Sequence, residues 1–465
     1  MQRVLIILFS LTVFFLAFLP IRDTDFGWHY RCGEELITQG KLCISNDYSY
    51  FLPDYKAYYP SFLFDALNAF VYDHSGFIGL STIGGLVIVL AGLLFLSISR
   101  GSLIVRMSMF MVVYILSSVV FNLGLRSQIF SYTFVLSTIW LLEKSQKNDR
   151  YLFVIPVLFF VWVNTHIGFF TGLFVLGAFT FERLMRDGVR SRTALKYSMV
   201  IGISIIATLL NPFGWKVYVE IARHIQSPLG SMIAEWVPSD IVTSSLMCIA
   251  AVILMSGMIY KRNIRVFSLL LLIFFLILAV TSRRSIPFFL TILSIEFLHL
   301  ISKWQLSLPP EITIPLLGAI AICIIIIQTP KTLELMNWNN YCIKGITHYP
   351  CEITGKKKAL RGNIFANYEW GGFLVWQMPE SRIFIDGRMP AWSNAAGVSP
   401  YKIYLSIIQT QTGWNEFLQE QKTDYILISP NTFLDVELAS NGQRRGWIET
   451  FRNEYVVLYK QTYKR

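Results

Sequence analysis

The sequence at residues 77–98 is FIGLSTIGGLVIVLAGLLFLSI, a run of 22 residues without a charged side chain. A helix needs about 20 consecutive apolar residues to cross the hydrocarbon core of a bilayer. This stretch therefore predicts a membrane-spanning helix, and similar stretches occur along most of the chain.

Ten further apolar runs of comparable character accompany it. The eleven predicted spans lie at about 4–20, 77–98, 103–121, 127–142, 151–165, 167–182, 197–211, 242–260, 265–281, 286–302 and 311–328. The first run ends in Phe18-Leu19-Pro20-Ile21 without a small-residue cleavage site, so it is predicted to be a retained anchor and not a signal peptide. The predicted fold is an α-helical membrane domain at 1–328, with long outer loops at 21–76 and 211–241, and a small α/β domain at 329–465.

Composition excludes a water-soluble protein. Hydrophobic residues make up 54% of the chain and charged residues 15%, with a mean hydropathy of +0.51, whereas soluble domains carry about 25% charge. The net charge of +11 does not predict a nucleic-acid partner, because Lys and Arg in a membrane protein serve orientation and contact lipid headgroups.

The distribution of positive charge predicts the orientation. With the N-terminus in the cytoplasm, fifteen Lys and Arg residues fall on the inside and only nine in the outer loops between spans, as the positive-inside rule requires. The asymmetry is strongest in RLMRDGVRSRTALK at 183–196, which carries five positive residues. An odd number of spans then leaves the domain 329–465 outside the cytoplasm.

Four cysteines lie in polar stretches on this outer, oxidising side: Cys32, Cys43, Cys342 and Cys351. Four cysteines can pair in three ways. Disulfides are expected in such a compartment, and the local pairs 32–43 and 342–351 are favoured. Free thiols are the alternative.

The C-terminal segment changes its hydrophobic period. Short buried strands are predicted at 383–385, 425–428 and 455–459, and a helix at 401–420. Its polar residues have no nucleophile–base or metal-ligand spacing, so we expect a recognition or structural role for this domain.

The stretch Asp386-Gly387-Arg388 follows the first of these predicted strands. Two interpretations stay open. An Asp-Gly-Arg after a strand commonly forms a tight turn with a local ion pair, and the alternative is a contact with an acceptor substrate.

The first outer loop begins IRDTDFGWHYRCGEELITQGKLCISNDYS at residue 21. Asp23 and Asp25 lie at most one helical turn past the first predicted span, so they are expected near the membrane surface. Trp28 and Tyr30 are typical of interface anchors. Carboxylates held there can meet a lipid headgroup, and a solvated acidic loop is the ordinary alternative.

Other polar residues also occur at the predicted outer ends of spans: Asn164, His166, Arg126, Glu235, Arg283 and Arg284. The pair Arg283-Arg284 goes against the positive-inside trend, and guanidinium groups bind phosphate or diphosphate in a bidentate manner. Ordinary explanations exist for each: the arginines can snorkel or pair with Glu235, and His166 can cap a helix. Polar groups at the membrane edge are nevertheless candidates for a functional site.

A polytopic chain with an Asp-X-Asp motif, a following helix GEELITQG and a C-terminal outer domain resembles the GT-C class of glycosyltransferases. That class includes protein mannosyltransferases, the aminoarabinose transferases of lipid A and oligosaccharyltransferases. DFGWHYRCGEELITQGKL at 25–42 is similar in register to the aminoarabinose-transferase type. The resemblance places Asp25 at the leading catalytic acid and Asp23 at a supporting one.

The chain also departs from the class. Phe26 follows Asp25 where an acid is expected, and the C-terminal domain lacks the tryptophan-rich acceptor motif of oligosaccharyltransferases. Instead it carries NYEWGGFLVWQMPESRIFIDGRMPAW at 367–392, which resembles a segment of bacterial GT-C-like proteins with unassigned acceptors. The resemblance therefore implies a multi-pass protein of the bacterial inner membrane.

The resemblance implies transfer of a sugar from a polyprenyl-phosphate donor to an extracytoplasmic polysaccharide, glycolipid or protein. Asp25 would be the general base that takes the proton of the attacking hydroxyl. Asp23 would orient the acceptor or, with Asp25, hold Mg²⁺ or Mn²⁺.

The remaining candidates are substrate contacts. Arg283, Arg284 or Arg126 would stabilise the leaving phosphate, and His166 and Glu235 would line the acceptor side. Asn164 and His29 complete the candidate substrate-binding residues.

Two other functions compete with an enzyme. A transporter or lipid flippase would place charges near the midplane and show inverted repeats, but the predicted spans carry almost no charge and no repeat is apparent. A non-enzymatic cell-surface scaffold would keep the loop for structure only.

Overall fold

The computed structural model describes residues 2–227, 233–262, 264–302, 309–344, 347–354, 360–394 and 396–462. Residues 228–232 of the predicted outer loop 211–241 lie outside this range. The chain forms two compact units. Unit 1 comprises Met1–Ile21, Ser75–Tyr218 and Pro228–Leu333, and unit 2 comprises Arg22–His74, Val219–Ser227 and Glu334–Arg465.

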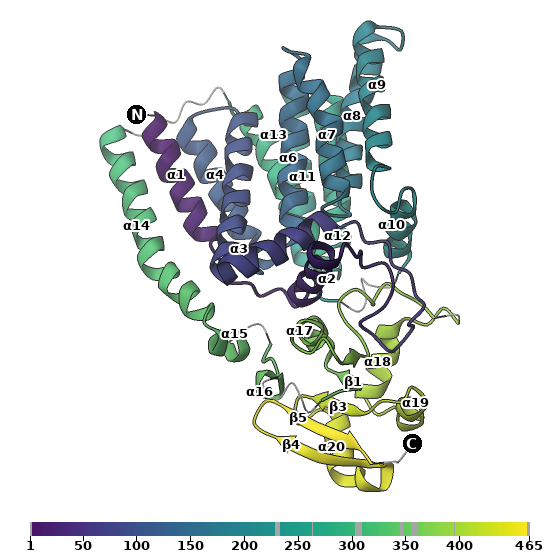
Figure 1. The fold of residues 1–465 in the computed structure, drawn as a ribbon. Coiled ribbons are helices and arrows are strands. Elements are labelled where there is room, and N and C mark those ends of the chain that lie inside the picture. The colour runs from purple at the N-terminus through teal and green to yellow at the C-terminus, as the bar shows by residue number, and fades with distance from the viewer. Residues whose placement is uncertain are drawn as a thin grey trace. The chain divides into compact units, whose positions relative to one another are not determined.

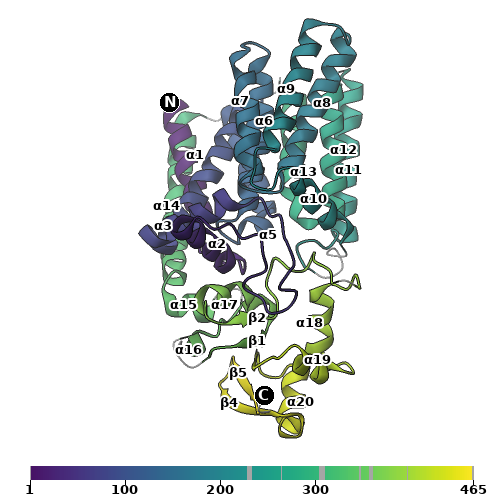
Figure 2. The same cartoon turned by 45° about the vertical axis from the view of Figure 1, so that its right-hand side comes forward.

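Unit 1 is a helical bundle. Its helices are α1 (Gln2–Ala17), α4 (Leu103–Leu116), α5 (Ser118–Phe121), α6 (Ser127–Ser145), α7 (Arg150–Val163), α8 (Phe169–Asp187), α9 (Arg192–Thr208), α11 (Ile241–Tyr260), α12 (Val266–Thr281), the short 3₁₀ helix η2 (Arg283–Ser285), α13 (Ile286–Leu300) and nearly all of α14 (Pro310–Leu335). In both views α6, α7, α8 and α9 run side by side (Figures 1 and 2). Apolar stacking holds them to their neighbours: the rings of Phe174 in α8 and Phe274 in α12 lie 3.7 Å apart between centroids.

Each of the eleven predicted apolar runs coincides with a helix. Within the described residues, three helices are long and apolar enough to cross a membrane: Phe62–Ile98, Ile241–Tyr260 and Ile312–Leu335. Four shorter apolar helices are α1, α4, α7 and α12. The helical character of the runs is therefore established, while the number of spans stays a prediction.

Helix α3 (Phe62–Ile98) belongs to both units and is bent at Gly76. The backbone of Gly76 has φ 57° and ψ −154°, a conformation that residues with a side chain rarely adopt. The predicted span 77–98 therefore begins directly after this bend.

Unit 2 is built on a mixed sheet. In the described part of the chain the sheet has the order β2-β1-β3-β5-β4, with β1 (Asn363–Ala366), β2 (Arg382–Ile383), β3 (Tyr425–Ile428), β4 (Trp447–Arg452) and β5 (Val457–Gln461). Strand β1 is parallel to β2 and β3, whereas β5 is antiparallel to β3 and β4.

Unit 2 also contains helices, some of which pack near the sheet and some of which lie apart from it (Figures 1 and 2). They are α2 (Phe26–Gln39), the first part of α3, most of α10 (Lys216–Gln226), α15 (Trp338–Lys344), α16 (Cys351–Thr354), η3 (Tyr368–Trp370), α17 (Gly371–Gln377), α18 (Pro400–Ile408), α19 (Trp414–Glu420), α20 (Phe433–Asn441) and η4 (Gln443–Arg445). The small α/β character predicted for the C-terminal segment is present.

The single helix predicted at 401–420 is wrong. The structure has α18 and α19 instead, separated by Thr410 (φ 54°) and Gly413 (φ 88°). Positive φ values interrupt a right-handed helix. The predicted strand 425–428 matches β3, and the predicted strands 383–385 and 455–459 overlap β2 and β5, whereas β1 and β4 were not predicted.

The first outer loop is part of the core of unit 2. Tyr50 and Phe51 are buried together with Phe365 and Phe384 of the C-terminal segment. The loop also extends the sheet at β2, since Ile383 donates its N–H to the carbonyl of Tyr48 at 3.0 Å and accepts from Tyr50 at 3.2 Å. The sequence analysis assigned this loop to the membrane domain, but in the structure it folds with the C-terminal segment.

Two disulfides lie in the described part of unit 2. Cys32 in α2 is bonded to Cys43, and Cys342 in α15 is bonded to Cys351 in α16. These are the local pairs favoured from the sequence. The first disulfide ties the middle of α2 to the loop that enters the core.

Candidate active site

Asp23 and Asp25 lie at the beginning of α2. Asp25 is the residue that precedes the helix, and its backbone N–H donates to Oδ1 of Asp23 at 3.2 Å. Asp23 is buried. The N-terminus of a helix favours negative charge, and Asp25 immediately precedes that end of α2.

Helix α17 contacts the first turn of α2 through glycines. A β-carbon on Gly27 would lie 2.0 Å from the carbonyl oxygen of Gly372, and one on Gly372 would lie 2.4 Å from that of Thr24. The two backbones therefore touch beside Asp25, at a separation that only glycine permits.

The negative charge of these carboxylates affects the pKa of two buried tyrosines. Burial raises the pKa of the Tyr349 phenol, and the negative charges of Asp23 and Asp25 add to the rise. Burial also raises the pKa of Tyr368, with the charge of Asp25 as the next cause. Both phenols therefore keep their protons at neutral pH, and both lie within reach of the charge of Asp25.

His29 is held by a carboxylate that sequence reasoning missed. Its Nδ1 lies 2.5 Å from Oδ1 of Asp65 in the first turn of α3, and Ser61 donates to the other oxygen of Asp65 at 3.1 Å. The indole of Trp28 stacks on the imidazole at 3.5 Å between centroids. Because Nδ1 is occupied, the nitrogen that His29 can offer to a substrate is Nε2.

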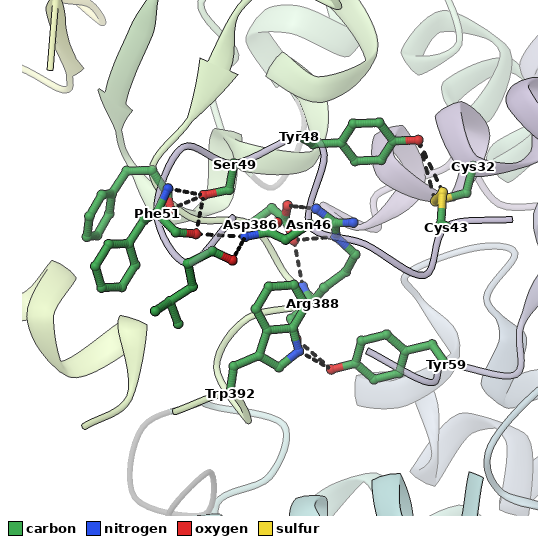
Figure 3. Close-up of polar contacts among 12 residues, drawn as sticks. Cys32, Cys43, Asn46, Tyr48, Ser49, Phe51, Tyr59, Asp386, Arg388 and Trp392 are labelled. Carbon is green, nitrogen blue, oxygen red and sulfur yellow. Dashed lines mark hydrogen bonds and ion pairs between the residues drawn. A yellow bond between two sulfur atoms is a disulfide. The ribbon is translucent and has the colours of Figure 1, made fainter. Parts of the chain in front are cut away.

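The stretch Asp386-Gly387-Arg388 forms a tight turn with a local ion pair. Asp386 accepts from the backbone N–H of Arg388 at 2.9 Å and from its guanidinium at 2.9 and 2.6 Å. Figure 3 shows Arg388 between Tyr48 and Trp392, and the guanidinium lies 4.8 Å from the centre of the Tyr48 ring. Tyr59 donates to the carbonyl of Arg388 at 2.6 Å. This is the turn interpretation of the motif, and the turn is anchored to the first outer loop.

The arginine candidates lie in unit 1 and form a group with Glu235. Arg126 contacts Glu235 at 2.7 Å, and the guanidinium of Arg284 lies 4.3 Å from the centre of the Trp236 ring. Burial raises the pKa of Glu235, but the charges of Arg126 and Arg284 outweigh it and leave that pKa below its usual value. Both guanidinium groups therefore interact with the carboxylate of Glu235.

Three further candidates of unit 1 have structural partners. Arg283 donates its backbone N–H to the carbonyl of Val237 at 3.2 Å. The backbone N–H of Gly168, the residue before α8, donates to Nδ1 of His166 at 3.1 Å. Asn164 is buried and donates to two backbone carbonyls, at 2.7 and 3.0 Å. For His166 and Asn164 the structure thus provides an ordinary role in shaping the turn between α7 and α8.

A divalent cation would find few protein ligands. Among the described residues, no group of three or more His, Cys, Asp or Glu side chains has an arrangement that could hold a metal ion. Mg²⁺ commonly uses one or two carboxylates and completes its shell with water and substrate phosphate. Asp23 and Asp25 therefore fit only an ion that takes most of its ligands from water and substrate.

Comparisons with known proteins rest on structure alone. No family model and no curated protein matches the sequence. The fold matches solved structures of polytopic glycosyltransferases of the GT-C type. At 11–12% identity this likeness establishes the fold.

The individual matches cover almost the whole chain. The oligosaccharyltransferase of Archaeoglobus fulgidus, tethered to an acceptor peptide containing the NVT sequon, matches with TM-score 0.63 and 12% identity over 99% of this chain and 74% of its own. The same enzyme, AglB, with an inhibitory peptide and dolichol-phosphate matches with TM-score 0.61 and 12% identity over 96% and 70%. ArnT from Cupriavidus metallidurans bound to undecaprenyl phosphate matches with TM-score 0.54 and 11% identity over 98% and 97%.

Proposed function

We propose that this protein is a membrane glycosyltransferase that transfers a sugar from a polyprenyl-phosphate donor to an acceptor on the extracytoplasmic side. The observation that carries the proposal is the pair Asp23 and Asp25 at the beginning of α2, within a GT-C fold. Two proteins of that fold were solved with dolichol-phosphate and undecaprenyl phosphate, and the donor proposed here belongs to the same chemical class.

In this proposal Asp25 is the general base. The acceptor hydroxyl attacks the anomeric carbon, its proton passes to Asp25, and the bond from the sugar to the phosphate breaks. The buried tyrosines beside Asp25 add hydrogen-bond donors, and Nε2 of His29 is a further polar contact for substrate. Mg²⁺ or Mn²⁺ at Asp23 and Asp25 would supply positive charge to the donor phosphate.

The leaving phosphate gains negative charge as the glycosidic bond breaks. Fixed positive charge stabilises such a group most in surroundings that exclude water. Arg126 and Arg284 are our candidates for this role, because both guanidinium groups act on Glu235 and therefore lie close to each other. Arg283 stays a candidate as the half-buried sequence neighbour of Arg284.

The proposed location is the bacterial inner membrane, with the N-terminus in the cytoplasm and the C-terminal segment outside. The charge asymmetry of the loops supports this orientation. Both disulfides of unit 2 support it as well, because disulfides persist in oxidising compartments.

The experiment compares membranes containing wild-type protein, Asp25→Asn and Asp54→Asn at matched expression, each supplied with a panel of polyprenyl-phosphate sugars. Asp54 is an exposed carboxylate of the same loop, so it controls for the chemical change. Loss of a general base reduces turnover by about 10²- to 10⁴-fold. We expect that loss for Asp25→Asn and wild-type transfer for Asp54→Asn. Equal activity of all three proteins would exclude Asp25 as the base, and no transfer from any donor would favour a scaffold or transporter.

A further inference from the structure

Gly387 lies directly against the carboxylate of Asp25. A β-carbon on Gly387 would lie 1.7 Å from Oδ1 of Asp25, 2.7 Å from its Cγ and 3.2 Å from its Oδ2. Real β-carbons essentially never approach another heavy atom within 3.0 Å. The space that a side chain at position 387 would need is therefore filled by the Asp25 carboxylate.

The backbone does not require glycine at this position. Gly397 and Gly413 have positive φ values, whereas Gly387 does not. Alanine would fit the backbone conformation at 387, and the three nearest atoms to its β-carbon would all belong to Asp25. Close approach to this carboxylate is thus the reason for a glycine here.

The turn that carries Gly387 is rigid. The side chains of Asp386 and Arg388 are buried, and their ion pair bridges the glycine. Helix α17 packs beneath the turn, since a β-carbon on Gly371 would lie 2.4 Å from the carbonyl oxygen of Ile385. A rigid surface with no side chain therefore lies against Asp25.

We propose that the turn Asp386-Gly387-Arg388 is a positioning element for Asp25, so that the C-terminal segment orients the carboxylate contributed by the first outer loop. The inference rests on the proposed role of Asp25 as the base. A base must lie within about 2.6–3.2 Å of the proton that it removes. Gly387 is a positioning residue: it acts by limiting where the Asp25 carboxylate can lie.

The test measures kcat and the KM for the lipid donor in wild type, Gly387→Ala and Gly202→Ala. Gly202 in α9 is the control, because a β-carbon there would meet nothing within 4 Å. A misplacement of about 1 Å can reduce turnover about 10²-fold. We expect a fall in kcat of that size for Gly387→Ala with little change in KM, and wild-type constants for Gly202→Ala.

A second measurement tests the contact without using activity. Thermal unfolding is compared for wild type, Gly387→Ala, Asp25→Ala and the double variant. We expect the added methyl group to lower the melting temperature when Asp25 is present and to have no such effect in the Asp25→Ala background. Equal losses in both backgrounds, or wild-type kcat for Gly387→Ala, would overturn the inference. Activity in Asp25→Asn would instead contradict the proposed base, and the unfolding cycle would still report on the contact.

Discussion

Asp65 determines what His29 can do. It is buried, accepts from His29 and Ser61, and lies where α3 begins. The beginning of α3 also packs closely on α2, because a β-carbon on Gly33 would lie 1.9 Å from the carbonyl oxygen of Asp65. The imidazole is therefore held one turn after Asp25 by a partner whose own position is fixed.

We predict that Asp65→Asn lowers both stability and transfer. A buried hydrogen bond to a charged group contributes about 1.5–3 kcal/mol, and the amide can no longer accept from both donors as an anion. Thermal or denaturant unfolding in detergent measures the first effect, and donor turnover measures the second. Asp54→Asn is the matched control. An Asp65→Asn protein with unchanged stability and turnover would show that the His29–Asp65 pair is dispensable.

Single residues also mark the limit of what sequence predicts. Asp23 and Asp25 were found because they are close in sequence and follow an apolar run. Asp65 was missed, and Gly387 was named only as part of the Asp386-Gly387-Arg388 turn, because their contacts with His29 and Asp25 join positions far apart in the chain. His166 and Asn164 were predicted to contact substrate because of their position in the sequence. Their hydrogen bonds are made with backbone carbonyl and amide groups, and no sequence motif identifies such partners.

At the scale of elements, the crossing of α2 and α17 holds the carboxylates in place. Around it, Phe26, Tyr30, Tyr72 and Trp376 form an aromatic cluster, with the rings of Phe26 and Trp376 5.2 Å apart between centroids. The crossing thus combines backbone contact on one side with large apolar surface on the other. Any side chain placed between the backbones would separate the two helices.

We predict that Gly27→Ala disrupts this crossing. The added methyl group would overlap the carbonyl oxygen of Gly372, and overpacking of a rigid contact costs about 1–3 kcal/mol. The variant should lose sugar transfer. It should also be cleaved faster in limited proteolysis, at sites in the chain between α2 and α17. Gly318→Ala, where nothing lies within 4 Å of the new β-carbon, should behave like wild type. Normal proteolysis and transfer in Gly27→Ala would contradict the observed crossing.

Helices in apolar runs were predictable because the bilayer imposes their length and composition. The helices and strands of the C-terminal segment were less predictable from the sequence. The break between α18 and α19 depends on the backbone of Thr410 and Gly413, and β1 is only Asn363–Ala366. Such short elements are defined by their neighbours in the sheet, and local sequence does not contain that information.

At the scale of the whole molecule, each of the two units is built from three separate segments of the chain. Unit 2 takes up the first outer loop and a piece of α10 before the C-terminal segment completes it. Its sheet and the residues around Asp25 therefore form only after the last segment is synthesised.

Orientation is testable by labelling single cysteines. With the free Cys248 and Cys323 replaced by serine, we predict that an impermeant maleimide labels Thr412→Cys in intact spheroplasts. Lys147→Cys should be labelled only after permeabilisation, because the positive-inside rule places its loop in the cytoplasm. Both native positions are exposed. The opposite labelling pattern would reverse the proposed orientation and leave the fold unaffected.

The glycine contacts around Asp25 also define a signature for recognising relatives of this protein. Positions 27 and 372 exclude every side chain because backbone atoms fill the space, and a side chain at position 387 would displace the carboxylate of Asp25. The resulting pattern is Asp-X-Gly near the N-terminus, Trp-Gly-Gly far downstream and Asp-Gly-Arg shortly after it. Chains that keep all three elements would share this arrangement of the carboxylate even where their overall identity is too low to align.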